Sequence, residues 1–262
     1  MSTYGNRVND LSAVIKEPRR NVRYLIGHQG SKVTSKPKFL EGRDDIEFFS
    51  LDSVGVTQSR NYLLERANAD ICYFCDDDIQ LVDNFDELLR EVHLMDSSEI
   101  ITLRVDDESG FPRKKAPSSS KRGWLNILAV GTIEISLKRM YLGDIRFCEY
   151  MGAGSNIPIG DEAVFLSEFL REGYSISYQN KCIASHPKES SGSSPTISSI
   201  YARGVTIRKV YGFIIGLFLV PCFILLRRNL ISHPNIAVGM KAFVFGFLLI
   251  GLNKLKKRAQ QK

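Results

Sequence analysis

Three adjacent carboxylates follow a short apolar run in the first third of the chain. Asp76, Asp77 and Asp78 come directly after residues 71–75 (ICYFC), whose composition is typical of a buried strand. Open α/β sheets bind ligands at the carboxyl ends of their strands, and Mg²⁺ or Mn²⁺ prefers oxygen ligands and bridges to phosphates. Because alternate residues of an extended chain point the same way, Asp76 and Asp78 are predicted to share a side and to face a divalent metal ion. A solvated cap for the next helix is the alternative.

A second acidic pair, Asp161 and Glu162, follows a glycine-containing loop at residues 152–160. The pair stands at the start of a predicted helix, where the helix dipole favours acidic residues and is a sufficient reason for them. In an active site, one carboxylate of the pair can remove a proton from an attacking hydroxyl while a metal ion holds a leaving phosphate. Both interpretations stay open on these residues alone.

Three further features have a functional and a structural interpretation each. His186 is either a nitrogen ligand for a metal ion or a surface histidine. Arg60 either meets a phosphate near a strand end or is a solvated side chain that follows a helix cap. Cys72 and Cys75 have the spacing of a redox or zinc motif, but they lie in a predicted strand without a second pair, which favours buried core cysteines.

The elements that position these residues follow the order of an α/β protein. Residues 22–27, 46–51 and 71–75 are predicted strands, and residues 57–69 are a predicted helix between the last two, so a parallel layer is expected. Residues 84–95 and 163–172 are predicted helices, residues 100–105 a strand, and residues 126–136 one or two strands. Residues 106–123 and 188–199 are predicted mobile loops. Residues 1–7 have the composition of a turn, so the first strand of the layer is expected to be truncated or absent.

Charge is divided unevenly along the chain of 262 residues. The net charge is +6, but residues 201–262 hold 11 Lys or Arg and no Asp or Glu, which leaves −5 for residues 1–200. A basic tail of this kind indicates an anionic partner, either nucleic acid or a lipid surface. Five scattered cysteines, an odd number, do not predict a disulfide framework and favour a reducing, intracellular setting.

Two apolar runs in the tail favour the lipid surface. Residues 210–226 contain no charge and residues 236–252 contain only Lys241, and each run is followed by basic residues: Arg227 and Arg228 after the first, KLKKR at 254–258 after the second. Such flanks anchor to lipid headgroups, and no nucleic-acid partner is expected. The runs are predicted to form a helical hairpin that either spans a bilayer or lies in its interface. A pair of buried core helices is the alternative. If the hairpin spans twice, the basic cluster places both ends in the cytoplasm.

Taken together, these segments resemble the glycosyltransferase family 2 enzymes of the GT-A fold. The resemblance rests on STYGNR (2–7), VRYLIGHQG (22–30), GVTQSRNYLLERANADICYFCDDDI (55–79), YMGAGSN (150–156), GDEAVFL (160–166) and IASHP (183–187). It implies an α/β fold with a Rossmann-like mixed sheet flanked by helices. Residues 1–200 would then be the catalytic domain, and residues 201–262 a basic, hydrophobic, membrane-associating segment.

The resemblance also implies roles for the acidic residues and the histidine. Asp76 and Asp78 match the DxD motif of the family, with Asp78 the direct ligand of Mn²⁺ or Mg²⁺ and Asp76 nearer the ribose. His186 matches a late histidine that completes the metal shell in some members. Glu162 matches the acid that acts as catalytic base, and Asp161 would be a supporting acid.

The remaining implied roles concern the substrates. Thr3 and Tyr4 match the loop that holds the nucleotide base, and Arg60 is the candidate for a phosphate. The implied reaction is the inverting transfer of a sugar from a nucleotide-sugar donor to a hydroxyl of a saccharide or lipid-linked acceptor. We therefore expect a metal-dependent glycosyltransferase at the cytoplasmic face of a bacterial cell membrane, in cell-surface polysaccharide or glycolipid synthesis. A nucleotidyltransferase, and a degenerate transferase that serves as a membrane partner, are the alternatives.

Overall fold

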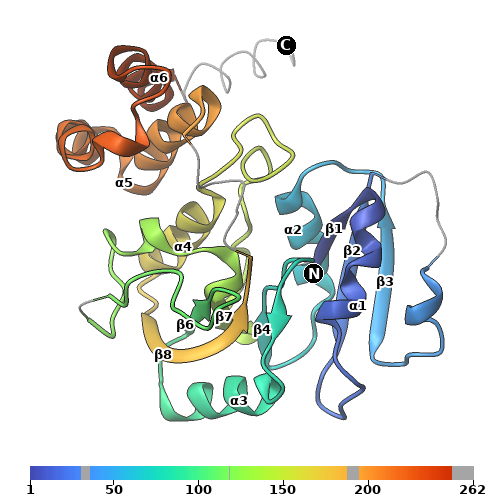
Figure 1. Ribbon diagram of the computed structural model, residues 1–262. Helices are drawn as coiled ribbons and strands as arrows, with labels where there is room; N and C mark the ends of the chain where they lie inside the picture. The colour runs from blue at the N-terminus through green and yellow to red at the C-terminus, as the bar shows by residue number, and fades with distance from the viewer. Residues whose placement is uncertain (31–35, 118, 188–194, 250–262) are drawn as a thin grey trace.

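A three-stranded parallel sheet forms the N-terminal part of the fold. The computed structural model describes residues 1–30, 36–117, 119–187 and 195–249. In it, β1 (Ser2–Tyr4), β2 (Tyr24–Gln29) and β3 (Ile46–Leu51) pair in that order, with helices α1 (Leu11–Val14) and α2 (Val56–Arg66) beside them (Figure 1). Because the strands are parallel, their carboxyl ends share one edge of the sheet.

A five-stranded mixed sheet forms the second part. Its order is β4 (Ile71–Tyr73), β7 (Ile135–Lys138), β6 (Ile100–Asp106), β8 (Ile176–Ser185) and β5 (Gln80–Leu81). Only β6 and β8 are parallel neighbours, and β8 curls strongly along its length (Figure 1). The sheet is flanked by α3 (Phe85–Met95) and α4 (Asp161–Arg171). The mixed α/β architecture predicted from the sequence is confirmed.

Helix α4 is held by the aromatic side chains of its buried face. Phe165 and Phe169 are fully buried, and the ring of Phe165 stacks on that of Phe147 with 3.9 Å between centroids. Packing of such a face, rather than intrinsic propensity, is the main source of stability for a helix of this length. The first turn of α4, which carries Asp161 and Glu162, is thereby fixed relative to the mixed sheet.

Helix α2 buries a polar face and uses it to fix a loop. The Thr57 hydroxyl donates to the carbonyl of Met151 at 2.8 Å. The Asn61 side-chain amide donates to the carbonyl of Phe147 at 2.9 Å and accepts from its backbone N–H at 2.8 Å. Buried polar groups need such partners, so these bonds fix the loop of residues 147–152 to α2.

Three expectations about secondary structure are wrong. Residues 71–73, expected to join the parallel layer of residues 22–27 and 46–51, form β4, which pairs antiparallel with β7 in the mixed sheet. Ser2–Tyr4, expected to belong to a turn, forms β1, in which Thr3 pairs with His28 of β2, so a first strand is present. Residues 126–136, expected to be strands, are mainly the 3-10 helices η3 (Ile127–Ala129) and η4 (Thr132–Glu134), and β7 begins only at Ile135. The Glu134 carboxylate accepts from the Gly131 backbone N–H at 3.0 Å and closes the turn of η4. Residue 118 and residues 188–194 of the two predicted mobile loops lie outside the described residues.

The predicted C-terminal helical hairpin is confirmed by α5 (Ile197–Leu226) and α6 (Ile236–Leu249). Residues 250–252 of the second apolar run and the KLKKR cluster lie outside the described residues. Gly212 interrupts α5 with φ 74° and ψ −171°, a conformation that only glycine adopts readily, and divides it into an inner half (residues 197–211) and an outer half (residues 213–226).

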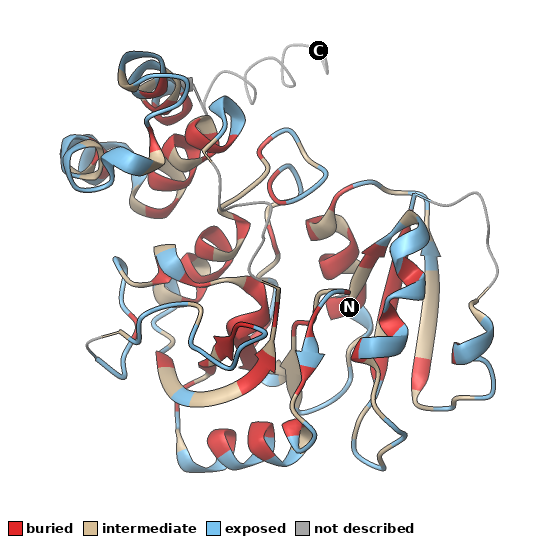
Figure 2. Ribbon diagram, viewed as in Figure 1, coloured by how far each residue is buried: buried red, intermediate tan, exposed pale blue. Residues whose placement is uncertain are grey.

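The inner half of α5 belongs to the core of the preceding domain. Ala202, Val205 and Val210 are buried in the same cluster as the aromatic residues of α4. The outer half is mostly exposed and lies away from both sheets, as Figure 2 shows. The boundary predicted at residue 200 therefore falls inside the first turns of a helix that the domain core holds in place.

Candidate active site

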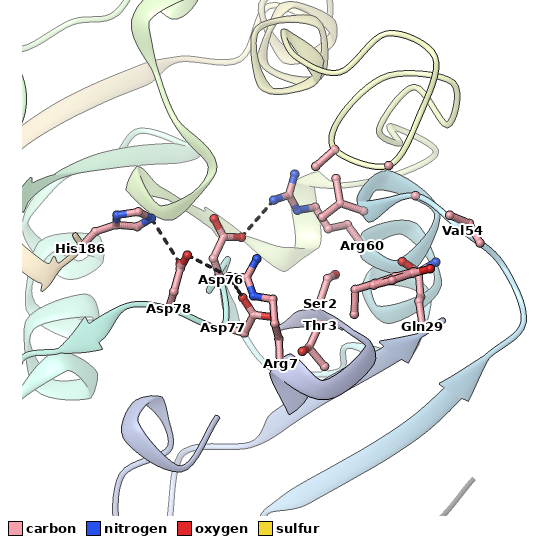
Figure 3. Close-up of a pocket in the computed structure, with 15 residues that line it drawn as sticks. Ser2, Thr3, Arg7, Gln29, Val54, Arg60, Asp76, Asp77, Asp78 and His186 are labelled. Carbon is pink, nitrogen blue, oxygen red and sulfur yellow. Dashed lines mark hydrogen bonds and ion pairs between the residues drawn. The ribbon is translucent and has the colours of Figure 1, made fainter. Parts of the chain in front are cut away.

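A cavity of about 600 Å³ lies at the carboxyl edge of the parallel sheet (Figure 3). Its walls come from the ends of β1 and β2, the loop before α2, α2 itself, the loops after β4 and β8, and the glycine-containing loop near residue 154. Six of the eight residues predicted from the sequence line it, namely Thr3, Tyr4, Arg60, Asp76, Asp78 and His186. Among the lining residues described, neither Asp161 nor Glu162 appears.

Arg7 and His186 partly offset the negative charge of Asp77 and Asp78 in this cavity. Nη2 of Arg7 lies 2.9 Å from Oδ2 of Asp78 and also forms an ion pair with Asp77. Nε2–H of His186 donates to Oδ1 of Asp78 at 3.3 Å, and this contact lowers the pKa of Asp78 and raises that of His186. Burial raises the pKa of Asp77, which is only 4% exposed. The site therefore concentrates negative charge that a cation can compensate.

The donor atoms present fit a divalent cation in part. Asp78 supplies carboxylate oxygens and His186 an imidazole nitrogen, and both side chains point into the cavity toward each other (Figure 3). Asp76, predicted to face the same ion, instead turns its carboxylate toward Arg60. Within the described part of the chain, no group of three or more His, Cys, Asp or Glu side chains can hold a metal ion. Asp78 and His186 thus fit as two ligands of an ion that needs further oxygen atoms.

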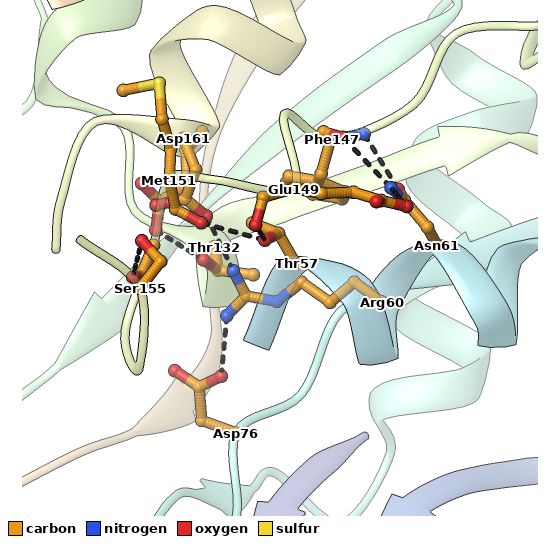
Figure 4. Close-up of polar contacts among 12 residues, drawn as sticks. Thr57, Arg60, Asn61, Asp76, Thr132, Phe147, Glu149, Met151, Ser155 and Asp161 are labelled. Carbon is orange, nitrogen blue, oxygen red and sulfur yellow. Dashed lines mark hydrogen bonds and ion pairs between the residues drawn. The ribbon is translucent and has the colours of Figure 1, made fainter. Parts of the chain in front are cut away.

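Arg60 connects the cavity to the second acidic pair. Its Nη2 lies 3.2 Å from Oδ1 of Asp76 and its Nη1 lies 2.9 Å from Oδ2 of Asp161 (Figure 4). Arg60 is 8% exposed and Asp161 only 3%. Burial, and then the charge of Glu162, raise the pKa of Asp161, whereas Arg60 opposes the shift. The guanidinium thereby holds two carboxylates from different elements in fixed positions.

Glu162 is held by a residue that the sequence did not indicate. The Thr132 hydroxyl donates to Oε1 of Glu162 at 2.5 Å, and Thr132 is 4% exposed. Thr132 lies in η4, which also contains Glu134, a buried carboxylate paired with Lys114 and Arg122. This arrangement orients one oxygen of Glu162 and leaves Oε2 for other partners.

Thr3 and Tyr4 occupy the wall formed by β1. Thr3 is buried and Tyr4 is largely exposed. The Tyr4 ring packs on Gly30, where a Cβ atom would lie only 2.2 Å from the ring, so glycine is required for this contact. Gln29 at the end of β2 donates to the Ser53 carbonyl at 2.8 Å. A flat aromatic side chain beside amide and hydroxyl groups is suited to a planar heterocycle.

Arg7 and Thr132 are the site residues that sequence reasoning missed. Arg7 reaches Asp77 and Asp78 because η1 (Gly5–Asn9) follows β1 at the shared edge of the sheet. The sequence gives no signal for this position, because residues 1–7 have the composition of a turn. A turn of η4 rather than a strand brings Thr132 to Glu162, so the erroneous strand prediction at 126–136 concealed this contact.

Cys72 and Cys75 are free thiols; Cys75 is buried in the core, as expected, whereas Cys72 is only partly buried. Burial raises the pKa of Cys72 to about 11 and that of Cys75 to about 12. Thiols with such pKa values remain protonated at neutral pH and are poor nucleophiles and metal ligands.

Comparison with solved structures shows what this architecture is similar to. The sequence matches no family model and no curated protein. The structure of S. aureus TarS 1–349 superposes with a TM-score of 0.61 at 13% identity, over 94% of this chain and 80% of that chain. The complex of TarS 1–349 with UDP-GlcNAc gives 0.57 at 14% identity over the same shares. The UDP complex gives 0.58 at 15% identity over 88% of this chain and 73% of that chain. At these identities the likeness concerns the fold, and this chain has the GT-A type of α/β fold with a C-terminal helical hairpin.

Proposed function

We propose that the chain is a metal-dependent, inverting glycosyltransferase that transfers a sugar from a nucleotide-sugar donor to an acceptor hydroxyl. The observation that carries the proposal is the cavity in which Thr3, Tyr4, Asp78 and His186 meet at the carboxyl edge of the parallel sheet. The fold supports it, because TarS, which has a similar fold, was solved with UDP-GlcNAc and with UDP.

The donor occupies this cavity with its base against β1 and its diphosphate toward the acidic end. Tyr4 and Thr3 bind the base, and Asp76 lies nearer the ribose. Asp78 and His186 hold Mn²⁺ or Mg²⁺, which would supply positive charge to the departing diphosphate. Arg60 offsets the charge of Asp76, which would otherwise repel the phosphates.

Glu162 acts as the catalytic base. With Oε1 fixed by Thr132, Oε2 takes the proton of the acceptor hydroxyl as that oxygen attacks the anomeric carbon. The attack comes from the face opposite the leaving diphosphate, so the configuration at the anomeric carbon inverts. Asp161 is a supporting acid: through Arg60 it fixes the start of α4 and so the backbone position of Glu162.

The acceptor is a saccharide or a lipid-linked sugar of bacterial cell-surface polysaccharide or glycolipid synthesis. The apolar helices α5 and α6 support a position at a membrane, where such acceptors are found. Only α5 among the described helices is long and apolar enough to be a candidate span, which by itself is weak support. The basic run at 254–258, outside the described residues, favours the cytoplasmic face.

Donor binding is tested by thermal shift with a panel of nucleotide sugars that includes UDP-GlcNAc, each with and without Mn²⁺. A ligand at a hundred times its Kd stabilises the folded chain by about 2.7 kcal/mol. We expect a metal-dependent shift with one donor, lost in Asp78→Asn. The matched control is Asp83→Asn, which removes the same charge from an exposed side chain outside the cavity. If no donor shifts the wild-type chain, the proposal fails.

Sugar transfer is tested separately from binding. Glu162→Gln should keep the donor-induced shift and lose transfer by about 10²- to 10⁴-fold, the usual contribution of a general base. Glu168→Gln, on the exposed side of the same helix, is the control and should transfer normally. A nucleotidyltransferase would not need Glu162, so undiminished turnover in Glu162→Gln would favour that alternative.

A further inference from the structure

The outer half of α5 presents apolar side chains on almost all sides. Among residues 213–226 only Gly216 and Val220 are buried, and Phe213, Ile214, Phe218, Leu225 and Leu226 are among the large hydrophobic residues that are exposed. The segment FIIGLFLVPCFILL contains no charged residue. A surface helix of a soluble protein has a polar face, whereas a helix that is apolar all round needs an apolar environment. Exposed apolar patches of this extent mark an interaction site.

Charge identifies the partner as an anionic lipid layer. Arg208 and Lys209 precede the outer half and Arg227 and Arg228 follow it, and no acidic residue occurs after residue 200. Exposed basic residues such as Arg227 and Arg228 at the end of an apolar helix are complementary to the phosphates of a lipid layer that the helix enters. A second copy of the chain would bring the same positive charges together, which is unfavourable.

The geometry of α5 favours a position within one leaflet. The inner half is fixed to the domain core, where Ala202 and Val205 are fully buried, so it cannot enter a bilayer. The break at Gly212 leaves 14 helical residues in the outer half, about 21 Å of helix. The hydrocarbon layer of a bilayer is about 30 Å thick, so this helix alone does not span it.

Helix α6 is held close to the inner half of α5 by its packing. A Cβ atom at Gly204 would lie 2.0 Å from the Phe243 carbonyl oxygen, and one at Gly246 would lie 2.1 Å from that of Tyr201. Small residues at both contacts let the two backbones approach closely, as in helix pairs in membranes. Because the inner half is fixed to the domain, α6 cannot extend away from it through a bilayer.

The position of Lys241 also supports an orientation of α6 parallel to the bilayer surface. It lies near the middle of α6, on the exposed face that also carries Val238 and Phe245. If α6 crossed the bilayer, the ammonium group would lie near the centre of the hydrocarbon, where a charge is strongly disfavoured. If α6 lies parallel to the surface, the side chain extends to the headgroups while its neighbours remain in the apolar layer.

We propose that the outer half of α5 and helix α6 insert together, parallel to the surface, into one leaflet of an anionic bilayer without crossing it. Arg227 and Arg228, which are exposed, contact the headgroups together with Lys241, whereas Arg208 lies over the Phe213 ring and Lys209 over the Tyr150 ring. This inference rests on the membrane association proposed above and is independent of the sugar-transfer reaction.

Binding is measured by co-flotation of the full chain with vesicles of phosphatidylcholine, alone or mixed with phosphatidylglycerol. We expect tighter binding to the mixed vesicles. Arg227→Gln/Arg228→Gln should bind them roughly 25-fold less, since each basic residue near an anionic surface contributes about fivefold. Arg20→Gln/Arg90→Gln removes the same charge from exposed positions far from the hairpin and should bind as the wild type does. Absence of binding to either vesicle would overturn the proposal.

Topology is measured with a membrane-impermeant maleimide and peptide mapping, on a Ser232→Cys variant added to preformed vesicles. Ser232 is exposed in the connection between α5 and α6, and the native, exposed Cys222 of the outer half is an internal reporter of insertion. We expect vesicles to protect Cys222 while position 232 is labelled equally in intact and detergent-opened vesicles. Protection of position 232 until the vesicles are opened would show a crossing and refute the in-plane arrangement.

Two further outcomes would also refute the proposal. If the apolar surface is covered by a second copy of the chain, Cys222 will be protected without vesicles, and light scattering will give a dimer mass. If Cys222 is labelled equally with and without bound vesicles, the outer half does not enter the lipid layer. Donor binding by thermal shift on the same sample separates either result from a failure of the proposed enzyme activity.

Discussion

Replacing Arg60 by methionine should destabilise the folded chain by about 3–5 kcal/mol at pH 9, the usual effect of removing one partner of a buried ion pair. The two carboxylates that Arg60 contacts contribute unequally. The Asp76 side chain is 34% exposed and can be rehydrated, whereas that of Asp161 is 4% exposed and cannot. Most of the loss therefore comes from the uncompensated charge of Asp161.

The size of this effect should depend on pH in a defined direction. In the variant, protonation of Asp161 removes the uncompensated charge. Burial already raises the pKa of Asp161, and loss of Arg60 removes the interaction that opposes the shift. A carboxyl whose pKa is higher in the folded than in the unfolded state stabilises the fold at low pH and loses that contribution as pH rises, by up to about 1.4 kcal/mol per pH unit. Burial raises the pKa of Asp161 to about 8 even with Arg60 present, so below pH 7 both folded chains hold this proton. The difference between variant and wild type should therefore be smaller at pH 7 than at pH 9.

The assay is urea unfolding followed by circular dichroism at both pH values. Asp161→Asn in the Arg60→Met background should recover much of the lost free energy of unfolding, because it removes the charge and keeps the shape. Arg66→Met, in the exposed last turn of the same helix, is the control and should cost less than about 1 kcal/mol. A loss below about 1 kcal/mol in Arg60→Met, or no recovery in the double variant, would refute the reasoning.

Three further changes test other parts of the structure. Thr132→Val should lower kcat for transfer at least about tenfold with an unchanged KM for the donor, and Thr132→Ser should restore it, because the hydroxyl orients Glu162; equal activity of both variants would exclude that role. Burial lowers the pKa of His93 to about 4, so the folded state binds fewer protons than the unfolded state between pH 6.5 and 4. Lowering the pH from 7 to 4.5 should therefore lower the unfolding free energy of the wild-type chain by about 2–3 kcal/mol more than that of His93→Gln. Parallel pH profiles of the two chains would contradict this. Gly160→Ala should lower the unfolding free energy by about 3 kcal/mol, because φ is +90° and the new Cβ would lie 2.0 Å from Oγ1 of Thr206; a near-neutral result in calorimetry would show that α5 can move aside.

Local sequence patterns predicted the elements that are stabilised by interactions between residues close together in the sequence. The strand at residues 46–51 and the helix ending at Met95 agree closely with β3 and α3, because apolar periodicity and first-turn acids act within a few residues. Ser2–Tyr4 has no apolar run, and it becomes a strand only by pairing with β2, more than 20 residues away. Residues 126–136 are apolar enough for a strand, but Glu134 and its pairs with Lys114 and Arg122 stabilise a 3-10 turn instead.

The candidate site was likewise predictable from the sequence only in part. The position of Asp76 and Asp78 after an apolar strand could be read from the sequence, as could the acids at the start of α4. The sequence could not show which carboxylate contacts which cation. Arg60 contacts Asp161 across 101 positions of sequence, and Arg7 contacts Asp78 across 71. Such pairings follow from how the two sheets are placed, and a single sequence carries no local signal for them.

The burial of the inner half of α5 determines where the chain can be shortened for crystallisation. Ending it at residue 200 would remove Ala202 and Val205 from a packed core and expose the apolar surface of α4. Ending it after Tyr211, which donates a hydrogen bond to the Trp124 carbonyl at 2.7 Å, keeps that core but removes α6, which buries Ile200 and Ile207 on the other face of the inner half. A chain of residues 1–211 therefore needs polar replacements at Ile200 and Ile207 before it can be crystallised without detergent.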